Sequence, residues 1–158
     1  MYPRTHARST PDKVAARLVD TGDELTYGQL DERSTRLARV LADAGLRRGD
    51  VVALLATNDL RALEVYWAAL RSGLYITAVN HHLSPDEVAY IVTDSEAAAL
   101  VVSADKGDVA LGIVDRTPDV RRIARHQSTG EGRNPGAVAD NEQVHRHDRL
   151  LFLWRSRK

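Results

Sequence analysis

The chain has 158 residues, no cysteine, and equal numbers of basic and acidic residues, so its formal net charge is zero. This length suits one domain with a core of its own. The balanced charge gives no electrostatic reason to expect nucleic acid or an anionic membrane as a partner. The missing cysteine excludes disulfides, thiolate zinc sites and cysteine nucleophiles.

The N-terminal residues do not have the pattern of a targeting signal. Residues 1–6 have no apolar core after a basic start, which argues against a secretory signal. No apolar run approaches the ~18 residues that a membrane span needs. We therefore expect a cytoplasmic protein.

The first predicted helix spans residues 27–44. Residues 1–24 form a polar entry, in which 14–19 could be helix or strand and 21–24 are typical of a turn. Thr26 and Gln29 then match a capping box, in which each side chain satisfies a backbone N–H at the start of a helix. An apolar stripe at three- and four-residue spacing follows, and Gly45 is a suitable left-handed end.

Strands and helices alternate along the next eighty residues. We predict strands at 51–56, 75–79, 99–103 and, in short form, 120–123, and helices at 59–72, 85–94 and 105–115. Asn58 and the pair Ser84 and Glu87 are the predicted caps, and Gly73 is the predicted helix end. This alternation predicts an α/β fold with a parallel sheet covered on both faces.

The character of the chain changes after Ala124. Residues 125–149 are rich in arginine, histidine and glycine and lose helical or strand periodicity, so we predict loop or disorder there. A short apolar cluster at 150–154 follows. A GC-rich gene read in another frame would give such a composition, and a true lineage-specific tail is the alternative.

Several short segments, in this order and spacing, resemble the adenylate-forming, or AMP-binding, enzyme superfamily. They are Leu25-Thr26-Tyr27-x-Gln29-Leu30, Gly45-Leu46-x-x-Gly49-Asp50-Val51-Val52-Ala53, Tyr66-Trp67-Ala68-Ala69-Leu70-x-x-Gly73 with Ala78-Val79-Asn80, Leu83-Ser84-Pro85-Asp86-Glu87, Tyr90-Ile91 and Asp94-Ser95. The sequence around Trp67 is most similar to that of bacterial fatty-acid and acyl-CoA synthetases. The resemblance covers roughly residues 5–123.

The resemblance implies a partial three-layer αβα sheet, the first part of the large N-terminal domain of such synthetases. It also implies chemistry in which ATP and a fatty acid form an acyl-adenylate, whose acyl group moves to coenzyme A, with magnesium as a cofactor. No Ser/Thr/Gly-rich phosphate loop ending in Pro-Lys-Gly occurs in the sequence. We therefore assign no catalytic, cofactor-binding or metal-binding residue, and divide the chain into residues 1–124, homologous to the synthetase domain, and a non-homologous tail at 125–158.

Two groups of residues could be taken for ligand sites. The glycine-rich loop 130–136 has neither a preceding strand nor a lysine, so a linker is the better interpretation than a phosphate cradle. His126, His145, His147 and Asp148 could suggest a metal site, but histidines two apart share a face only in a strand, which this segment does not resemble.

Other polar and aromatic residues have structural interpretations as well. His81 and His82 follow a strand, where ligands bind in open α/β sheets, although a structural loop is the preferred interpretation. Ser72, Ser84 and Ser103 lack the context of a nucleophile. The remaining candidates are interpreted as core (Tyr66 and Trp67), solvated turn (Arg47 and Arg48) and helix-start charges (Asp105 and Asp108).

These observations leave two main hypotheses. The first is a truncated acyl-CoA synthetase that is inactive alone. The second is a binding or assembly module, or one half of a split ligase. In either case we expect self-association, because a parallel sheet needs cover on both faces and neighbours at its edges.

Overall fold

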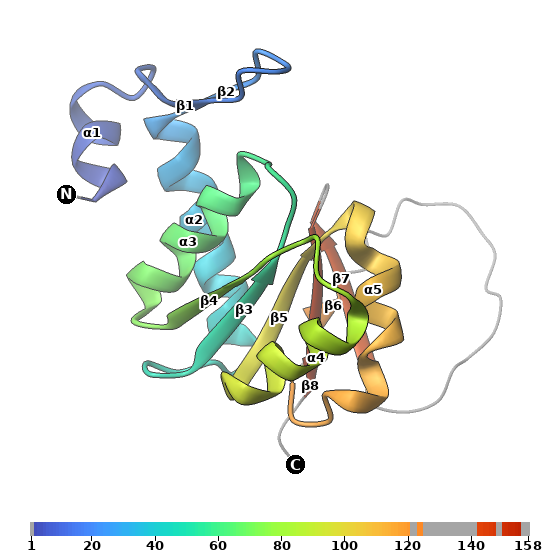
Figure 1. The fold of residues 1–158 in the computed structure, drawn as a ribbon. Helices are drawn as coiled ribbons and strands as arrows, with labels where there is room; N and C mark the ends of the chain where they lie inside the picture. Colours follow the sequence, from blue (N-terminus) through green and yellow to red (C-terminus); the bar gives the residue numbers. More distant parts are fainter. Residues whose placement is uncertain (1, 121–122, 125–141, 148–149, 156–158) are drawn as a thin grey trace, which may run out of the picture.

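The computed structural model describes residues 2–120, 123–124, 142–147 and 150–155. The helices are α1 (Pro3–Ser9), α2 (Tyr27–Asp43), α3 (Arg61–Ser72), α4 (Pro85–Asp94) and α5 (Gly107–Gly112), with 3₁₀ turns at Ala104–Lys106 and Val114–Arg116. The strands are β1 (Val14–Arg17), β2 (Glu24–Thr26), β3 (Val51–Leu55), β4 (Tyr75–Val79), β5 (Ala97–Ser103), β6 (Ile123–Ala124), β7 (Glu142–His147) and β8 (Leu150–Arg155). Figure 1 shows their arrangement.

The main sheet has the strand order β4-β3-β5-β8-β7-β6. Its first three strands are parallel, with Val52 paired to Ile76 on one side and to Ala99 on the other. Strand β8 runs antiparallel to both β5 and β7. A separate antiparallel pair, β1 and β2, lies near α1 and the start of α2 (Figure 1). The predicted α/β class with a parallel sheet is confirmed.

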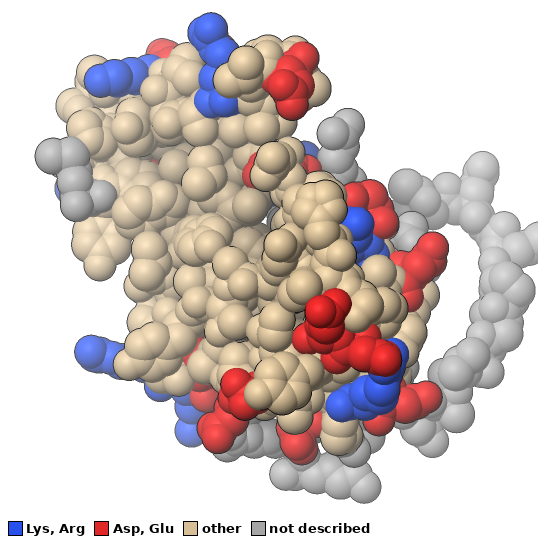
Figure 2. Space-filling view, viewed as in Figure 1, with Lys and Arg blue, Asp and Glu red and all other residues tan. Residues whose placement is uncertain are grey.

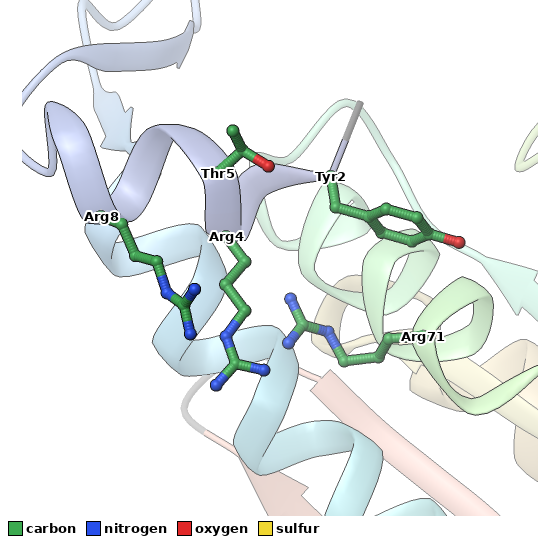
Figure 3. A pocket seen from close by; sticks show the side chains of 5 residues that line it. All are labelled: Tyr2, Arg4, Thr5, Arg8 and Arg71. Atoms are coloured by element: carbon green, nitrogen blue, oxygen red, sulfur yellow. The ribbon is translucent and has the colours of Figure 1, made fainter.

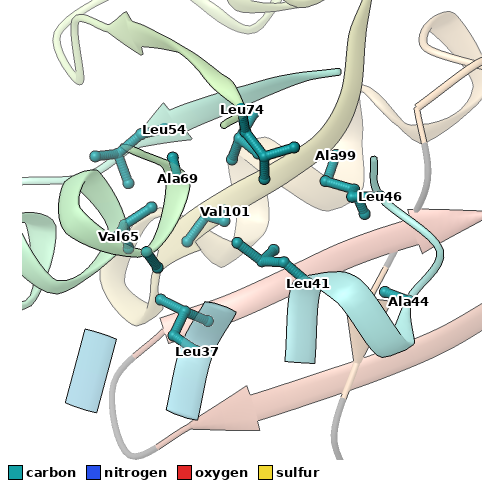
Figure 4. Close-up of a cluster of buried hydrophobic side chains, with 12 residues drawn as sticks. Leu37, Leu41, Ala44, Leu46, Leu54, Val65, Ala69, Leu74, Ala99 and Val101 are labelled. Atoms are coloured by element: carbon teal, nitrogen blue, oxygen red, sulfur yellow. The ribbon is translucent and has the colours of Figure 1, made fainter. Parts of the chain in front are cut away.

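Alternate residues of β3 point into two different apolar cores, as the two-residue repeat of a strand requires. Val52 and Leu54 belong to a cluster with residues of α2 and α3, where Leu41 is fully buried (Figure 4). Ala53 and Leu55 belong to a cluster with residues of α4 and α5. The parallel strands are therefore covered on both faces, which gives the predicted three layers.

Local caps determine where two of the long helices begin. At α2, the Gln29 N–H donates to Thr26 Oγ1 (3.3 Å) and the Thr26 N–H donates to Gln29 Oε1 (3.1 Å). At α4, the Glu87 N–H donates to Ser84 Oγ (3.4 Å) and the Ser84 N–H donates to a Glu87 carboxylate oxygen (2.8 Å). Both predicted capping boxes are confirmed.

Glycine ends α3 as predicted. Gly73 has φ of 70°, and an added Cβ would lie 3.0 Å from Cγ of Arg48. Both the left-handed backbone and the close approach of Arg48 therefore require glycine at this position.

Two predictions about helices are wrong, and one helix was not predicted. Asn58 does not cap α3, which begins at Arg61, where the backbone N–H donates to Asp59 Oδ1 (2.9 Å). The predicted helix at 105–115 is α5 flanked by two 3₁₀ turns. Helix α1 has no counterpart in the sequence prediction, because its seven residues are mostly exposed and show no apolar periodicity.

Two predictions about strands also need correction. Strand β4 forms one edge of the sheet, so Tyr75 is 68% exposed rather than buried. The loop predicted across 125–149 is wrong for residues 142–147, which form β7, because the apolar strand β8 pairs with this polar segment on one side and with β5 on the other. Pairing between distant segments is not visible in local periodicity.

Candidate acidic cleft at the strand ends

The order of the parallel strands creates a natural place for a ligand. The first strand, β3, lies between the second and the third, and the helices that follow β3 and β5 cover opposite faces of the sheet. The chain therefore leaves the carboxyl ends of β3 and β5 in opposite directions. Open α/β sheets bind ligands in the crevice at such a switch point.

A cleft of about 660 Å³ opens at this switch point, within the size range of small-molecule sites. Its walls come from the turn that joins β1 to β2, from the start of α2, from the segment between β3 and α3, and from the end of β5. The lining residues are Leu18, Thr21, Asp23, Glu24, Leu25, Arg33, Thr57, Asn58, Asp59, Leu60, Arg61, Glu64, Ser103, Ala104 and Asp105.

The deepest charge in this cleft is Glu64, in the first turn of α3. It is 4% exposed and accepts a hydrogen bond from Arg33 of α2 at 3.2 Å between Nη1 and Oε1. A carboxylate near the start of a helix also interacts favourably with the helix dipole. Arg33 and the helix start together explain how this carboxylate can be buried.

The other wall connects the two strand ends directly. The Thr57 N–H donates to Oγ of Ser103 (3.4 Å), which is 2% exposed, and the Thr57 hydroxyl lies 3.5 Å from Oδ1 of Asp105. These contacts hold the segments after β3 and β5 at a fixed separation. The hydroxyl of Ser103 therefore accepts a hydrogen bond from the backbone of the segment after β3.

Carboxylates outnumber arginines around the cleft. Asp23, Glu24, Asp59, Glu64 and Asp105 line it, against Arg33 and Arg61. An excess of negative charge raises the free energy of binding a triphosphate at this position. Within the described residues, no three histidine, aspartate or glutamate side chains are grouped so that they could hold a metal ion.

The predicted candidate residues do not come together at this cleft. His81 and His82 stack on each other, with ring centroids 4.0 Å apart, and the His82 N–H donates to Oδ1 of Asn80. Neither histidine lines the cleft. The interpretation of His81 and His82 as part of a structural loop stays a prediction. Of the three candidate serines, only Ser103 is in the cleft wall.

The aromatic and charged candidates have structural contacts. Tyr66 packs against the cluster beneath α2 and α3, and Trp67 contacts Tyr2 edge to face at 5.7 Å between centroids. Asp108 lies in the first turn of α5, as predicted. Asp105 does more than predicted, because it also forms part of the cleft wall.

The interpretation of the tail as a linker without a phosphate or metal site stays a prediction. The loop 130–136, His126 and Asp148 lie outside the described residues. His145 and His147 lie in β7, so the expectation that their segment is not a strand is wrong.

Sequence reasoning missed the contacts that join α2 to α3. Arg71 Nη2 lies 2.8 Å from Oδ1 of Asp31 and 2.9 Å from Oγ of Ser34, and its Nε donates to the Trp67 carbonyl (3.3 Å). The only local signal was Ser34, a polar residue on the apolar stripe of α2. Helix periodicity identifies a buried face, but it does not reveal which distant residue meets a polar group there.

The fold and its motifs have clear relatives. A model of the AMP-binding enzyme family matches residues 3–152. The chain therefore belongs to the AMP-binding enzymes, which confirms the resemblance seen in the sequence.

Several of the similar curated proteins are named as CoA ligases. A medium/long-chain-fatty-acid–CoA/3-oxocholest-4-en-26-oate–CoA ligase of Mycolicibacterium smegmatis is 32% identical over 115 residues, which are 73% of this chain and 20% of that protein. A 3-oxocholest-4-en-26-oate–CoA ligase of Rhodococcus rhodochrous is 32% identical over 113 residues, covering 72% and 20%. The chain thus spans about a fifth of the length of these curated relatives.

Solved structures agree with this assignment. The N-terminal domain of FACL13 from Mycobacterium tuberculosis superposes with a TM-score of 0.68 at 28% identity, covering 75% of this chain and 31% of that one. The anthranilate CoA ligase AuaEII has the same fold, with a TM-score of 0.71 at 22% identity, covering 77% and 23%. The chain therefore corresponds to part of the N-terminal domain of acyl-CoA ligases.

The comparisons differ in how far along the chain the similarity extends. The family match runs to residue 152, whereas the alignments to the relatives named above span 113 to 115 residues. The division after residue 124, and the out-of-frame origin of the tail, therefore stay predictions. No described helix is both long and apolar enough to cross a membrane.

Proposed function

We propose that this chain forms the first part of the N-terminal domain of a fatty-acyl-CoA ligase and does not by itself form acyl-adenylate. The observation that carries the proposal is the charge of the cleft at the strand ends. Carboxylates dominate the position where an α/β sheet would bind a nucleotide, and no glycine-rich loop with a lysine offsets them. Phosphoryl transfer depends on donors aimed at the phosphates, and this cleft offers few.

In this proposal the ligands bind to parts of a ligase other than this chain. These ligands are ATP, magnesium, fatty acid and coenzyme A. The names of the relatives support fatty acids or steroid side-chain acids as the acid substrate class. The cytoplasmic location and the division into residues 1–124 and a non-homologous tail belong to the same proposal. A chain cut after residue 124 should keep a cooperative unfolding transition if the division is correct, and lose it if β8 is required.

Exchange of labelled pyrophosphate into ATP tests the proposal directly. The purified chain should give the same exchange as buffer with fatty acids of several lengths, while the full Mycolicibacterium smegmatis relative serves as the positive control. Exchange above buffer that depends on added carboxylate would contradict the proposal.

One observation favours a second candidate, a chain that works with a separate complementary part. In Figure 2 the central surface over α3 and β4 is uncharged, and charged side chains surround it. Leu70 and Tyr75 are 47% and 68% exposed there, and β4 is the edge strand of the sheet. Such a surface and a free strand edge are suited to covering by more chain, and also to self-association.

Complementation distinguishes the second candidate from the first. The chain would be mixed with the remainder of the Mycolicibacterium smegmatis ligase, and pyrophosphate exchange measured. Restored exchange that is lost with Tyr75→Glu and kept with Tyr90→Glu would establish the split-ligase role. The two tyrosines are both 68% exposed, but Tyr90 lies on α4 rather than on the edge strand. Absence of exchange in every mixture would reject it.

A further inference from the structure

A second pocket lies between α1 and α3, away from the acidic cleft. It has a volume of about 480 Å³ and is lined by Tyr2, Arg4, Thr5, Arg8 and Arg71. Figure 3 shows the guanidinium groups of the three arginines converging from the two helices. No aspartate or glutamate is among the lining residues, so this pocket has the opposite charge to the cleft.

The three arginines are held to different extents. Arg71 is only 18% exposed at its side chain and is neutralised by Asp31 at 2.8 Å, with further hydrogen bonds to Ser34 and the Trp67 carbonyl. It forms a rigid, pre-oriented wall. A guanidinium fixed in this way loses little rotamer entropy when a ligand arrives.

Arg4 and Arg8 are exposed and lie one helical turn apart on the same face of α1. Like charges at this spacing destabilise a helix by about 0.2–0.5 kcal/mol. The segment Pro3–Ser9 contains no acidic residue, and within the described residues neither arginine has an ion-pair partner. The pocket therefore carries about two positive charges that no ion pair among the described residues balances.

We propose that this pocket binds a phosphate monoester group. Two unbalanced guanidinium charges match a phosphate monoester, which carries about −1.5 to −2 charges at pH 7, better than they match a single carboxylate. Its oxygens accept hydrogen bonds in the paired geometry that arginine offers. The volume exceeds that of phosphate alone, so the ligand class is a small organic phosphate. This site is independent of the proposed role as a ligase scaffold.

Isothermal titration of the whole chain with glycerol 3-phosphate tests the proposal. Saturable binding that glycerol and acetate do not reproduce is the expected result. A second arm uses phosphatidylcholine vesicles with and without phosphatidic acid, which carries the same phosphate monoester in a lipid. Binding in the first arm assigns a free organic phosphate, and binding confined to the second assigns a lipid headgroup. Failure to bind in both arms overturns the proposal.

Paired variants distinguish binding at this pocket from non-specific attraction to positive charge elsewhere on the surface. R4Q/R8Q should weaken binding at least tenfold, while R36Q/R39Q, which removes two exposed arginines of α2, should stay within twofold of the unaltered chain. R4K/R8K keeps the charge without the planar fork and should give an intermediate loss. Equal losses in R4Q/R8Q and R36Q/R39Q would show non-specific attraction and overturn the proposal, provided that thermal unfolding shows both variants to be folded.

Discussion

The two helical layers that cover the parallel strands differ in the length of their helices and in the burial of their ion pairs. On one face, α2 and α3 are long, meet along a seam with half-buried ion pairs, and share a cluster of fully buried leucine and valine. On the other face, α4 and α5 are shorter. Among the described residues of this layer, Arg116 forms an ion pair with Asp86, and this pair is exposed. Both faces contain fully buried apolar side chains, as Val88, Val92 and Ile113 show on the α4–α5 face, so the layers differ in helix length and in the burial of their ion pairs rather than in their apolar cores.

The largest expected effect comes from the core of the α2–α3 layer. Leu41→Ala removes a side chain that is fully buried, and should lower the free energy of unfolding by about 2–5 kcal/mol. The same change at Leu111 of α5, which is 58% exposed, should alter it by less than about 0.5 kcal/mol. Urea unfolding measures both. Equal effects would show that burial does not determine the cost of these two substitutions.

The next effect concerns the ion pairs of each layer. Arg71→Met removes the partner of Asp31 and the donors to Ser34 and Trp67, and should cost about 1–3 kcal/mol, because half-buried acceptors lose their hydrogen bonds. Arg116→Met breaks a pair whose side chains are 44% and 84% exposed, and should cost at most about 0.5 kcal/mol. Thermal and urea unfolding of the two variants would check the ranking, and a reversed order would contradict it.

A pair of glycines provides a smaller test with opposite signs. Gly73→Ala should destabilise by about 1–2 kcal/mol, since φ is 70° and the new methyl would meet Arg48. Gly107→Ala should stabilise by about 0.4–1 kcal/mol, since its backbone is helical, with φ of −55°, and nothing lies within 4 Å. Two destabilised variants would mean that α5 is packed more tightly than its geometry suggests.

The smallest effect is a difference in pH dependence between the two capping boxes. The Ser84 side chain, and then its backbone N–H, lower the pKa of Glu87 below 4.5 by hydrogen bonding to the carboxylate. This contribution to stability is present above the unfolded pKa of Glu87 and is lost as pH falls through the lowered folded value. The equivalent residue of α2 is Gln29, which does not titrate, so only the α4 cap should weaken in acid.

NMR titration of the Glu87 side chain measures this directly. In Ser84→Ala its pKa should rise toward 4.5, because the main cause of the shift is removed. Thr26→Ala serves as the control and should leave the Glu87 titration unchanged. An unaltered Glu87 pKa in Ser84→Ala would show that Ser84 is not the cause.

What the sequence could reveal depends on whether a contact is local or joins two distant elements. Thr26, Ser84 and Gly73 act on their own helix ends, so local patterns predicted them correctly. The Arg71 network and the Arg4–Arg8 pocket depend on how α1, α2 and α3 meet, and no local period carries that information. Strand β7 was missed for the same reason, since its partner β8 makes it a strand.

The cleft at the strand ends was only half predictable. Alternating strands and helices predicted that a ligand would bind at the carboxyl ends of the strands, but they did not predict the strand order that sets the switch point. Its acidic character was hidden, because its carboxylates come from the β1–β2 turn, the start of α3 and the end of β5. These segments are far apart in the sequence and have no shared motif.

The position of β3 has a consequence for how the protein is made. It is the first parallel strand to leave the ribosome, yet it lies between its two successors, β4 and β5. Contacts between near neighbours in sequence form fastest, because they close the shortest loops. Pulse-labelled hydrogen exchange should therefore protect β3 and β4 amides before those of β8. The parallel part of the sheet would grow outward from β3, and β4 and β5 would each pair with an edge of that strand once it is in place.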